Sequence, residues 1–114
     1  MLPYLFGLFI LVMAGGAVLA VLERRRQAPP LPVSVWHGLL GIAAIVLLVM
    51  QAVAHPGDHP VNVAVIVFIL TALGGLLLFA FRASKQTLPL AVVLMHAGFA
   101  VTAAILLCVG WMRS

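Results

Sequence analysis

Acidic residues are almost absent from this sequence. Only Glu23 and Asp58 carry carboxylates in 114 residues, and both lie at or beyond the ends of hydrophobic runs. Charged residues of both signs make up 7% of the chain, against roughly 25% in a typical soluble domain. Hydrophobic residues make up 66% and the mean hydropathy is +1.32. This composition excludes a soluble globular domain and indicates an integral membrane protein.

Cysteine is equally scarce. Cys108 is the single cysteine, so neither a disulfide framework nor a cysteine-based metal site can form within one chain. Five of the six basic residues lie in two short connections, so the net charge of +4 gives no sign of a nucleic-acid partner. The chain is too short for a membrane domain plus a soluble one. We therefore predict a single transmembrane domain over residues 1–114.

Four hydrophobic runs are each long enough to cross a bilayer as a helix, which takes about 20 residues. They cover residues 3–22, 32–54, 61–81 and 88–112. Isolated spans must be helical, because a helix satisfies its own backbone polar groups in lipid.

The connections between the runs predict the orientation. Residues 23–30 and 82–87 are basic, whereas residues 55–60 contain no lysine or arginine. The positive-inside rule then places the first and third connections in the cytoplasm and both termini on the outer side. Arg113 alone disagrees with this assignment. We expect a multi-pass protein of a bacterial-type cytoplasmic (inner) membrane.

The chain repeats itself at a spacing of 59 residues, the separation of His37 and His96. With that shift the halves align without a gap, and 14 of 55 paired positions are identical. Matches between rarer residue types carry the most weight: Gly15-Gly16 with Gly74-Gly75, Gln27 with Gln86, Pro30 with Pro89, and His37 with His96. We infer a tandem duplication, with repeat one over residues 1–55 and repeat two over residues 60–114.

Each repeat is predicted to be a two-helix hairpin with a basic turn. An even number of spans gives both copies the same orientation, related by a pseudo-twofold axis along the membrane normal. Short connections favour antiparallel neighbours. The predicted fold is therefore an all-α, integral membrane four-helix bundle built from two tandem hairpins of parallel orientation.

His37 and His96 are the only histidines inside hydrophobic runs. His37 lies five residues beyond Pro32, or about 7–8 Å deep at about 1.5 Å per residue. The duplication gives His96 the same depth, so the two imidazoles should face each other across the bundle. Small residues lie on the same helix face as each histidine, four and seven positions further along. They are Gly41 and Ala44 after His37, and Ala100 and Ala103 after His96.

The other two helices carry glycine pairs near this depth. Gly15-Gly16 lies about 10 Å from the inner end of its run, and Gly74-Gly75 matches it. Basic residues follow just beyond: Arg24, Arg25, Arg26, Arg82 and Lys85. The arrangement describes a slot for a flat ligand with a nitrogen donor on each face. It predicts one haem b, with iron bound by His37 and His96, ring edges against the glycines, and propionates near the arginines.

Each feature alone has a simpler explanation. Glycine pairs commonly allow membrane helices to pack closely, and basic loop residues determine topology. A membrane histidine can form a hydrogen bond to a neighbouring helix or contact a quinone. Two histidines at symmetric positions, without any carboxylate in the spans, favour haem.

A second polar cluster, His55, Asp58 and His59, occupies the outer connection. Its spacing could bind a metal or a second haem. However, the last span has no histidine near its outer end, and a connection broken by proline and glycine is more typical of a turn that ends two helices.

The pattern resembles the four-helix membrane b-type cytochromes, broadly the cytochrome b561-like group. The resemblance lies in the bundle, in His37 and His96 on different helices, and in the glycines (Gly15, Gly16, Gly74, Gly75). It covers the whole chain as architecture, without a long motif. Those proteins usually carry two haems and four helix-borne histidines, whereas this chain offers two. The resemblance implies electron transfer through haem b, and the two histidines of this chain fit one haem per chain.

We expect an electron carrier or redox subunit rather than a stand-alone enzyme. Two axial imidazoles leave no open coordination site, which restricts the chemistry to one-electron transfer. The expected partners are membrane lipid and a quinol or another redox subunit, with homo- or hetero-oligomers left open. Two alternatives remain: a cofactor-free accessory subunit of a larger membrane complex, and a quinone- or small-molecule-binding membrane protein lined by His37, His96 and Gln51.

Overall fold

The computed structural model describes residues 1–25 and 31–114. Over these residues the chain forms four α-helices: α1 (Leu2–Arg24), α2 (Leu31–Ala54), α3 (His59–Ala83) and α4 (Leu90–Met112). Every boundary lies within two residues of the predicted span. All four helices are long and apolar enough to cross a membrane. The predicted all-α fold is confirmed, and the chain is a multi-pass membrane protein.

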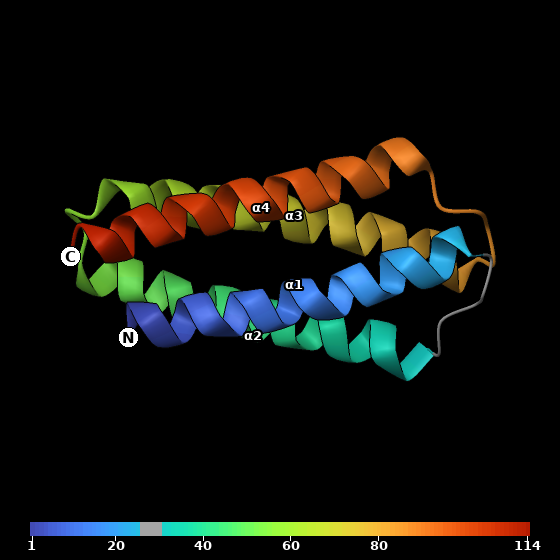
Figure 1. Cartoon of the computed structure of the whole chain (residues 1–114), viewed down its shortest axis with the longest axis horizontal. Helices are drawn as coiled ribbons and strands as arrows, with labels where there is room; N and C mark the ends of the chain where they lie inside the picture. The colour runs from blue at the N-terminus through green and yellow to red at the C-terminus, as the bar shows by residue number, and fades with distance from the viewer. Residues whose placement is uncertain (26–30) are drawn as a thin grey trace.

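The helices run antiparallel in chain order (Figure 1). The N-terminus, the α2–α3 turn and the C-terminus lie together, which we call the terminal end. The opposite end carries Arg24, Arg25, Arg82 and Lys85, and we call it the basic end. The long axis of the bundle measures 43 Å, enough for a hydrocarbon core of about 30 Å plus part of the headgroup regions.

Local chemistry explains where α3 begins and ends. Asp58 caps its first turn, because a carboxylate oxygen accepts a hydrogen bond from the Val61 amide at 3.3 Å. At the other end Lys85 adopts a left-handed conformation with φ 57°. This lets the Gln86 amide donate to the Phe81 carbonyl at 2.9 Å, as in a Schellman cap.

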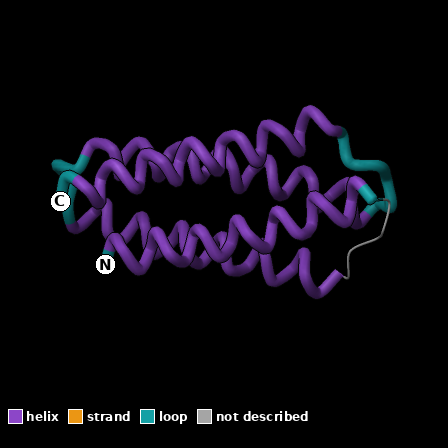
Figure 2. Tube along the Cα trace, in the orientation of Figure 1, coloured by secondary structure: helices purple, strands orange, loops and turns teal. Residues whose placement is uncertain are grey.

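The helices run along the length of the molecule, and the loops lie at its two ends (Figure 2). Their contacts close into a square, in which each helix packs against two others. Helix α1 packs against α2 and α4, and α3 packs against the same two neighbours. In the diagonal pairs, α1 with α3 and α2 with α4, no two Cα atoms lie within 8 Å of each other. Side chains from diagonal helices therefore meet only across the central axis.

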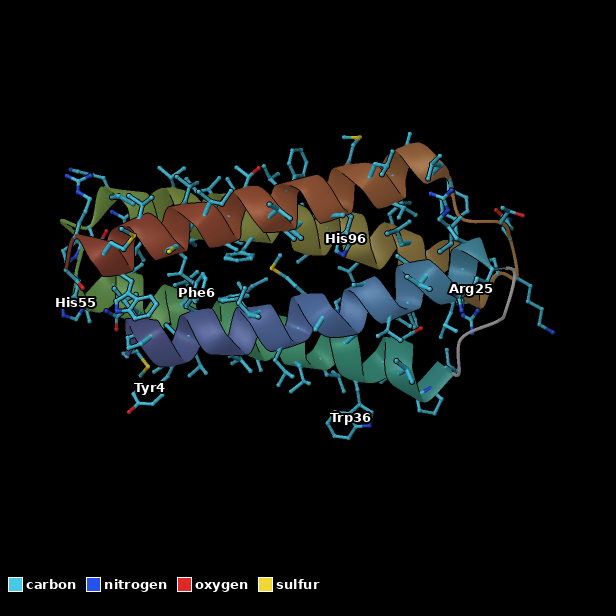
Figure 3. All side chains as sticks on the ribbon, viewed as in Figure 1. Tyr4, Phe6, Arg25, Trp36, His55 and His96 are labelled. Atoms are coloured by element: carbon cyan, nitrogen blue, oxygen red, sulfur yellow. The ribbon has the colours of Figure 1, made fainter. Side chains whose placement is uncertain are left out.

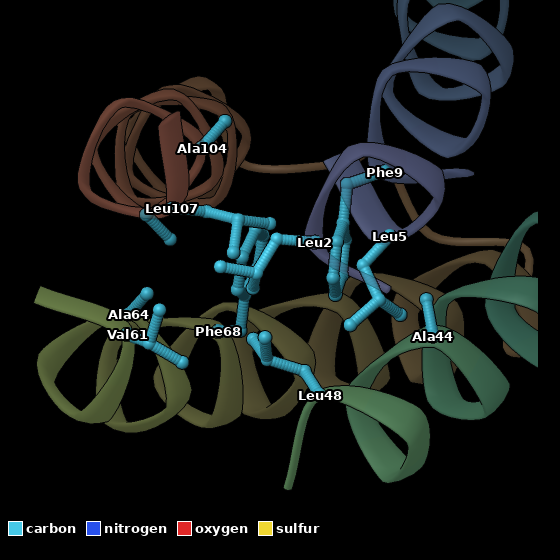
Figure 4. Packing of buried hydrophobic residues seen from close by; sticks show 11 residues of the cluster. Leu2, Leu5, Phe9, Ala44, Leu48, Val61, Ala64, Phe68, Ala104 and Leu107 are labelled. Atoms are coloured by element: carbon cyan, nitrogen blue, oxygen red, sulfur yellow. The ribbon is translucent and has the colours of Figure 1, made fainter. Parts of the chain in front are cut away.

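The buried core follows the repeat. Five pairs of buried hydrophobic residues are each separated by the repeat spacing: Leu2 with Val61, Leu5 with Ala64, Phe9 with Phe68, Ala44 with Ala103, and Leu48 with Leu107. They converge from all four helices in one cluster (Figure 4). Equivalent positions of the two hairpins thus fill equivalent places, as a pseudo-twofold arrangement requires.

This core occupies only the half of the bundle toward the terminal end. No described residue from position 10 to 43, or from 72 to 102, is buried. The half toward the basic end, which contains His37 and His96, therefore has no packed hydrophobic centre of its own.

Shortening a core side chain should lower the free energy of unfolding, whereas shortening an exposed side chain of the same helix should not. Leu48 is fully buried, whereas Leu39 of the same helix is 55% exposed. We expect Leu48→Ala to lower the free energy of unfolding in detergent by about 2–5 kcal/mol, because it leaves a cavity. Leu39→Ala should change it by less than about 0.5 kcal/mol. Reversible denaturation followed by circular dichroism measures both, and equal losses would contradict this core assignment.

Candidate functional site

His37 and His96 face each other across the bundle axis. They lie on α2 and α4, a diagonal pair, and their ring centres are 6.3 Å apart with the planes at 80°. Figure 3 shows His96 on the inward side of α4, whereas Trp36, the neighbour of His37, points away from the bundle. The two rings thus meet in the half of the bundle that lacks a packed core.

This separation suits one metal ion between the two rings. Imidazole nitrogen binds transition metals at about 2.0–2.1 Å, and the ring centre lies about 1.1 Å beyond the nitrogen. Two imidazoles on opposite sides of one ion therefore have centres roughly 6 Å apart. The observed 6.3 Å agrees with that value.

Each histidine is held by one ring nitrogen. The His37 Nδ1 atom lies 2.9 Å from the carbonyl oxygen of Val12, and the His96 Nδ1 atom lies 2.8 Å from that of Thr71. A carbonyl oxygen can only accept, so each Nδ1–H donates, and in the neutral ring Nε2 keeps its lone pair. Metal-bound histidines are commonly oriented by this kind of hydrogen bond to the backbone.

The two Nε2 atoms remain available. Neither atom forms a hydrogen bond within the described part of the chain, and no side-chain nitrogen or oxygen there is both buried and unpaired. Each Nε2 lone pair is therefore left without a protein partner, and neither Nε2 atom is fully buried. An oriented ring with a free, accessible nitrogen is the arrangement that axial coordination of a metal requires.

Glycines make room for the imidazole rings. A Cβ atom at Gly16 would lie 2.8 Å from Cε1 of His37, and one at Gly75 would lie 2.9 Å from Cε1 of His96. A side chain at either position would force the ring or the helix to shift. Sequence reasoning expected the glycines to border a porphyrin, but the groups nearest to them are the imidazoles. Their role in this structure is to let each histidine pack against the neighbouring helix of its own hairpin.

The small residues beyond the histidines have different surroundings. A Cβ atom at Gly41 would lie 3.6 Å from the Val12 side chain, so this glycine belongs to the α1–α2 contact. Ala100 is half-buried, whereas Ala44 and Ala103 are fully buried in the core. The small-residue faces predicted from the sequence therefore lead from the histidines into the packed half.

The predicted basic residues lie at the end of the bundle nearer the histidines. Arg24, Arg25 and Lys85 are exposed and Arg82 is half-buried. Figure 3 shows Arg25 where α1 ends. Arg24 lies eight residues, or about 12 Å along the helix, beyond Gly16. Arg26, also predicted to belong to the site, falls outside the described residues.

The second predicted cluster forms the turn at the terminal end. Nδ1 of His55 lies 3.2 Å from the Gln51 amide nitrogen, and Asp58 caps α3. A pocket of about 300 Å³ lies beside them, lined by Gly57, Asp58, His59, Pro60, Gly110 and Arg113. Within residues 1–25 and 31–114, no three His, Cys, Asp or Glu side chains are grouped to hold a metal ion. The described contacts at Asp58 are those of a helix-ending turn.

Gln51, which the quinone alternative placed beside the histidines, lies far from them. It follows His37 by 14 residues, or about 21 Å along α2. The structure therefore does not bring these two side chains into one site.

Sequence reasoning missed the two hydrogen-bond acceptors. Val12 and Thr71 act through backbone carbonyls, which carry no residue-type signal, and only their spacing of 59 residues links them. The two hydrogen bonds join equivalent residues in the two repeats, so the repeat is present in side-chain geometry as well as in sequence. No protein-family model, no curated protein and no solved structure matches this chain.

Proposed function

We propose that this protein is a membrane electron-transfer protein that holds one haem b between His37 and His96. The observation that carries the proposal is the facing pair of imidazoles, 6.3 Å apart, each fixed through Nδ1 with Nε2 free. The same unit occurs once per repeat, so the duplication yields two equivalent donors on opposite sides of the axis.

The residues of the site have separable tasks under this proposal. His37 and His96 bind the iron, the carbonyls of Val12 and Thr71 orient them, and Gly16 and Gly75 accommodate their rings. The basic residues beyond the site would neutralise the propionates. Held by His37 and His96, a haem would supply one-electron transfer.

The distribution of buried residues supports one haem rather than two. Cytochrome b561-like proteins, which the chain resembles in architecture, usually carry two haems on four helix-borne histidines. Here the half of the bundle without His37 and His96 contains the hydrophobic core, with Leu5, Leu48 and Leu107 at 1% exposure or less. It has neither the space nor a second pair of inward histidines.

The charge distribution supports an orientation with the basic end in the cytoplasm of a bacterial-type inner membrane. The apolar helix surfaces contact membrane lipid. A quinol or another redox subunit is the proposed electron partner, because a single haem must receive its electron from another molecule and deliver it to another.

A cofactor-free accessory subunit is the second candidate, and one observation favours it. The bonds from His37 to Val12 and from His96 to Thr71 tie together the helices of each hairpin. Such bonds between membrane helices contribute about 1 kcal/mol or less. That role uses only Nδ1 and does not account for the two imidazole rings facing each other across the axis at 6.3 Å, which is why haem is preferred.

Haem content tests the proposal. The chain, expressed in haem-replete cells and purified in detergent, should contain one haem and one iron per chain and show a low-spin b-type absorbance spectrum. Correctly folded, helical protein that remains colourless and iron-free under these conditions would favour the accessory subunit.

A further inference from the structure

We propose that the histidine pair can be reached only from the basic end of the bundle, because the Phe9–Phe68 stack closes the site toward the terminal end. The closure concerns this chain's own packing and stands with or without haem. Its functional consequence rests on the proposed function: the electron donor and the electron acceptor must both approach from the basic end.

The closing element is a pair of aromatic rings on the bundle axis. Phe9 and Phe68 are stacked with ring centres 3.9 Å apart and planes 11° from parallel. They are 2% and 3% exposed. They belong to α1 and α3, the diagonal pair that does not carry the histidines, so their contact spans the centre of the square.

The stack lies directly beside the histidine site. Phe9 precedes Val12 by three residues and Phe68 precedes Thr71 by three, or about 4.5 Å along each helix. Because α1 and α3 both start at the terminal end, the stack lies on the terminal side of the carbonyls that hold the histidines. It is the first packed layer in that direction.

Further layers continue to the terminal end. Leu5 with Ala64, and Leu2 with Val61, follow the stack, and all four are at most 6% exposed. Gly110 is packed so closely that an added Cβ atom would lie 2.6 Å from the Val61 side chain. Toward the basic end, Thr71 is the last buried residue of α3, and no described residue of α1 beyond Phe9 is buried.

The lateral groove between α1 and α4 offers no aqueous route past the stack. A groove of about 430 Å³ runs between α1 and α4 beside the packed half, with Phe6, Met13, Ile105 and Cys108 among its lining residues. Its lining consists of hydrophobic side chains and one cysteine, so it suits a lipid chain rather than water or a charged reagent.

Distance reinforces the closure. His37 lies six residues, or about 9 Å, from the basic end of α2, but 17 residues, or about 26 Å, from the terminal end. His96 lies at nearly the same distances from the two ends of α4. Electron tunnelling rates fall exponentially with distance, so exchange through the packed half would be far slower. The chain would then shuttle electrons on one side of the membrane rather than carry them across it.

Cysteine accessibility tests the closure without any cofactor. In a Cys108→Ala background, His96→Cys places a thiol in the site. Ser84→Cys and Gly57→Cys mark the basic and terminal ends, since both positions are exposed. Each variant, reconstituted in vesicles, is treated with a charged, membrane-impermeant thiol reagent on one side at a time. His96→Cys should react only from the side that labels Ser84→Cys.

Opening the stack should remove this sidedness. Adding Phe9→Ala and Phe68→Ala should let His96→Cys react from both sides, whereas Phe9→Leu with Phe68→Leu should preserve one-sided reaction. Reaction of the parent His96→Cys from the Gly57 side, or from neither side, overturns the proposal, and this holds even if the alanine variants fail to fold. If the wild-type protein contains no haem but His96→Cys still reacts from one side only, the proposed function is refuted and the closure stands.

If the wild-type chain carries haem, the same vesicles give a second readout. A membrane-impermeant reductant should reduce the haem only when it is added on the side that labels Ser84→Cys. Equal reduction from the other side would overturn the one-sided assignment while leaving haem binding intact.

Discussion

Replacing His37 or His96 with alanine is expected to remove the low-spin b-type spectrum from the purified protein. Either change deletes one of the two nitrogen donors that face each other 6.3 Å apart. Loss of groups that merely orient a metal ligand commonly costs about 10–100-fold in metal affinity. Loss of a ligand itself should therefore lower haem occupancy by more than about tenfold. Absorbance per chain, before and after reduction, measures the effect.

The remaining histidines supply the matched control. His55 and His59 are exposed at the terminal end, so His55→Ala and His59→Ala should keep full haem content. A low-spin spectrum that survives in His37→Ala would refute the ligand assignment. Helix content measured by circular dichroism separates loss of haem from loss of the fold, because each histidine ties only one helix pair.

Adding a single methyl group at Gly16 or Gly75 is the second large effect we expect. In each case the new Cβ would lie within 3 Å of a histidine Cε1, so the imidazole or the helix must move. Overpacking of this kind costs about 1–3 kcal/mol, and here the strain falls on the iron ligands themselves. Gly16→Ala and Gly75→Ala should each reduce haem occupancy and perturb the low-spin spectrum of what remains.

The glycines adjoining the histidines on α2 and α4 give a close comparison. Gly38 follows His37 directly and Gly98 follows His96 by two residues, and a Cβ at either would meet nothing within 4 Å. Gly38→Ala and Gly98→Ala should leave the haem spectrum unchanged. Equal losses in all four variants would indicate a general effect of glycine replacement and contradict the role assigned to Gly16 and Gly75.

Helix number, length and order were predictable because hydrophobic runs must match the bilayer thickness. The facing geometry of His37 and His96 was also predictable, since a duplication imposes equal depth and a twofold relation on equivalent residues. The hydrogen-bond acceptors were not, because a backbone carbonyl leaves no mark on the sequence. Whether the histidines hold haem stays a prediction.

The location of the core was the least predictable feature. Lipid-facing and buried positions are both hydrophobic in these helices: Leu48 is fully buried, whereas Leu39 and Val46 of the same helix are more than half exposed. Without a polar face, periodicity cannot indicate which way a helix turns. The Phe9–Phe68 stack is an example. The sequence identifies the two residues as an identical pair of the repeat, but it does not indicate that their rings are in contact.

Electron paramagnetic resonance of the oxidised, purified wild-type protein tests the central claim most directly. Two imidazole ligands make ferric haem low-spin, and nearly perpendicular ring planes, as in the 80° observed here, give the strongly anisotropic form of that signal. We predict this signal at one haem per chain. A high-spin signal would mean that only one histidine binds the iron, and absence of haem iron would mean that the histidines serve the helices alone; either result would contradict the proposed site.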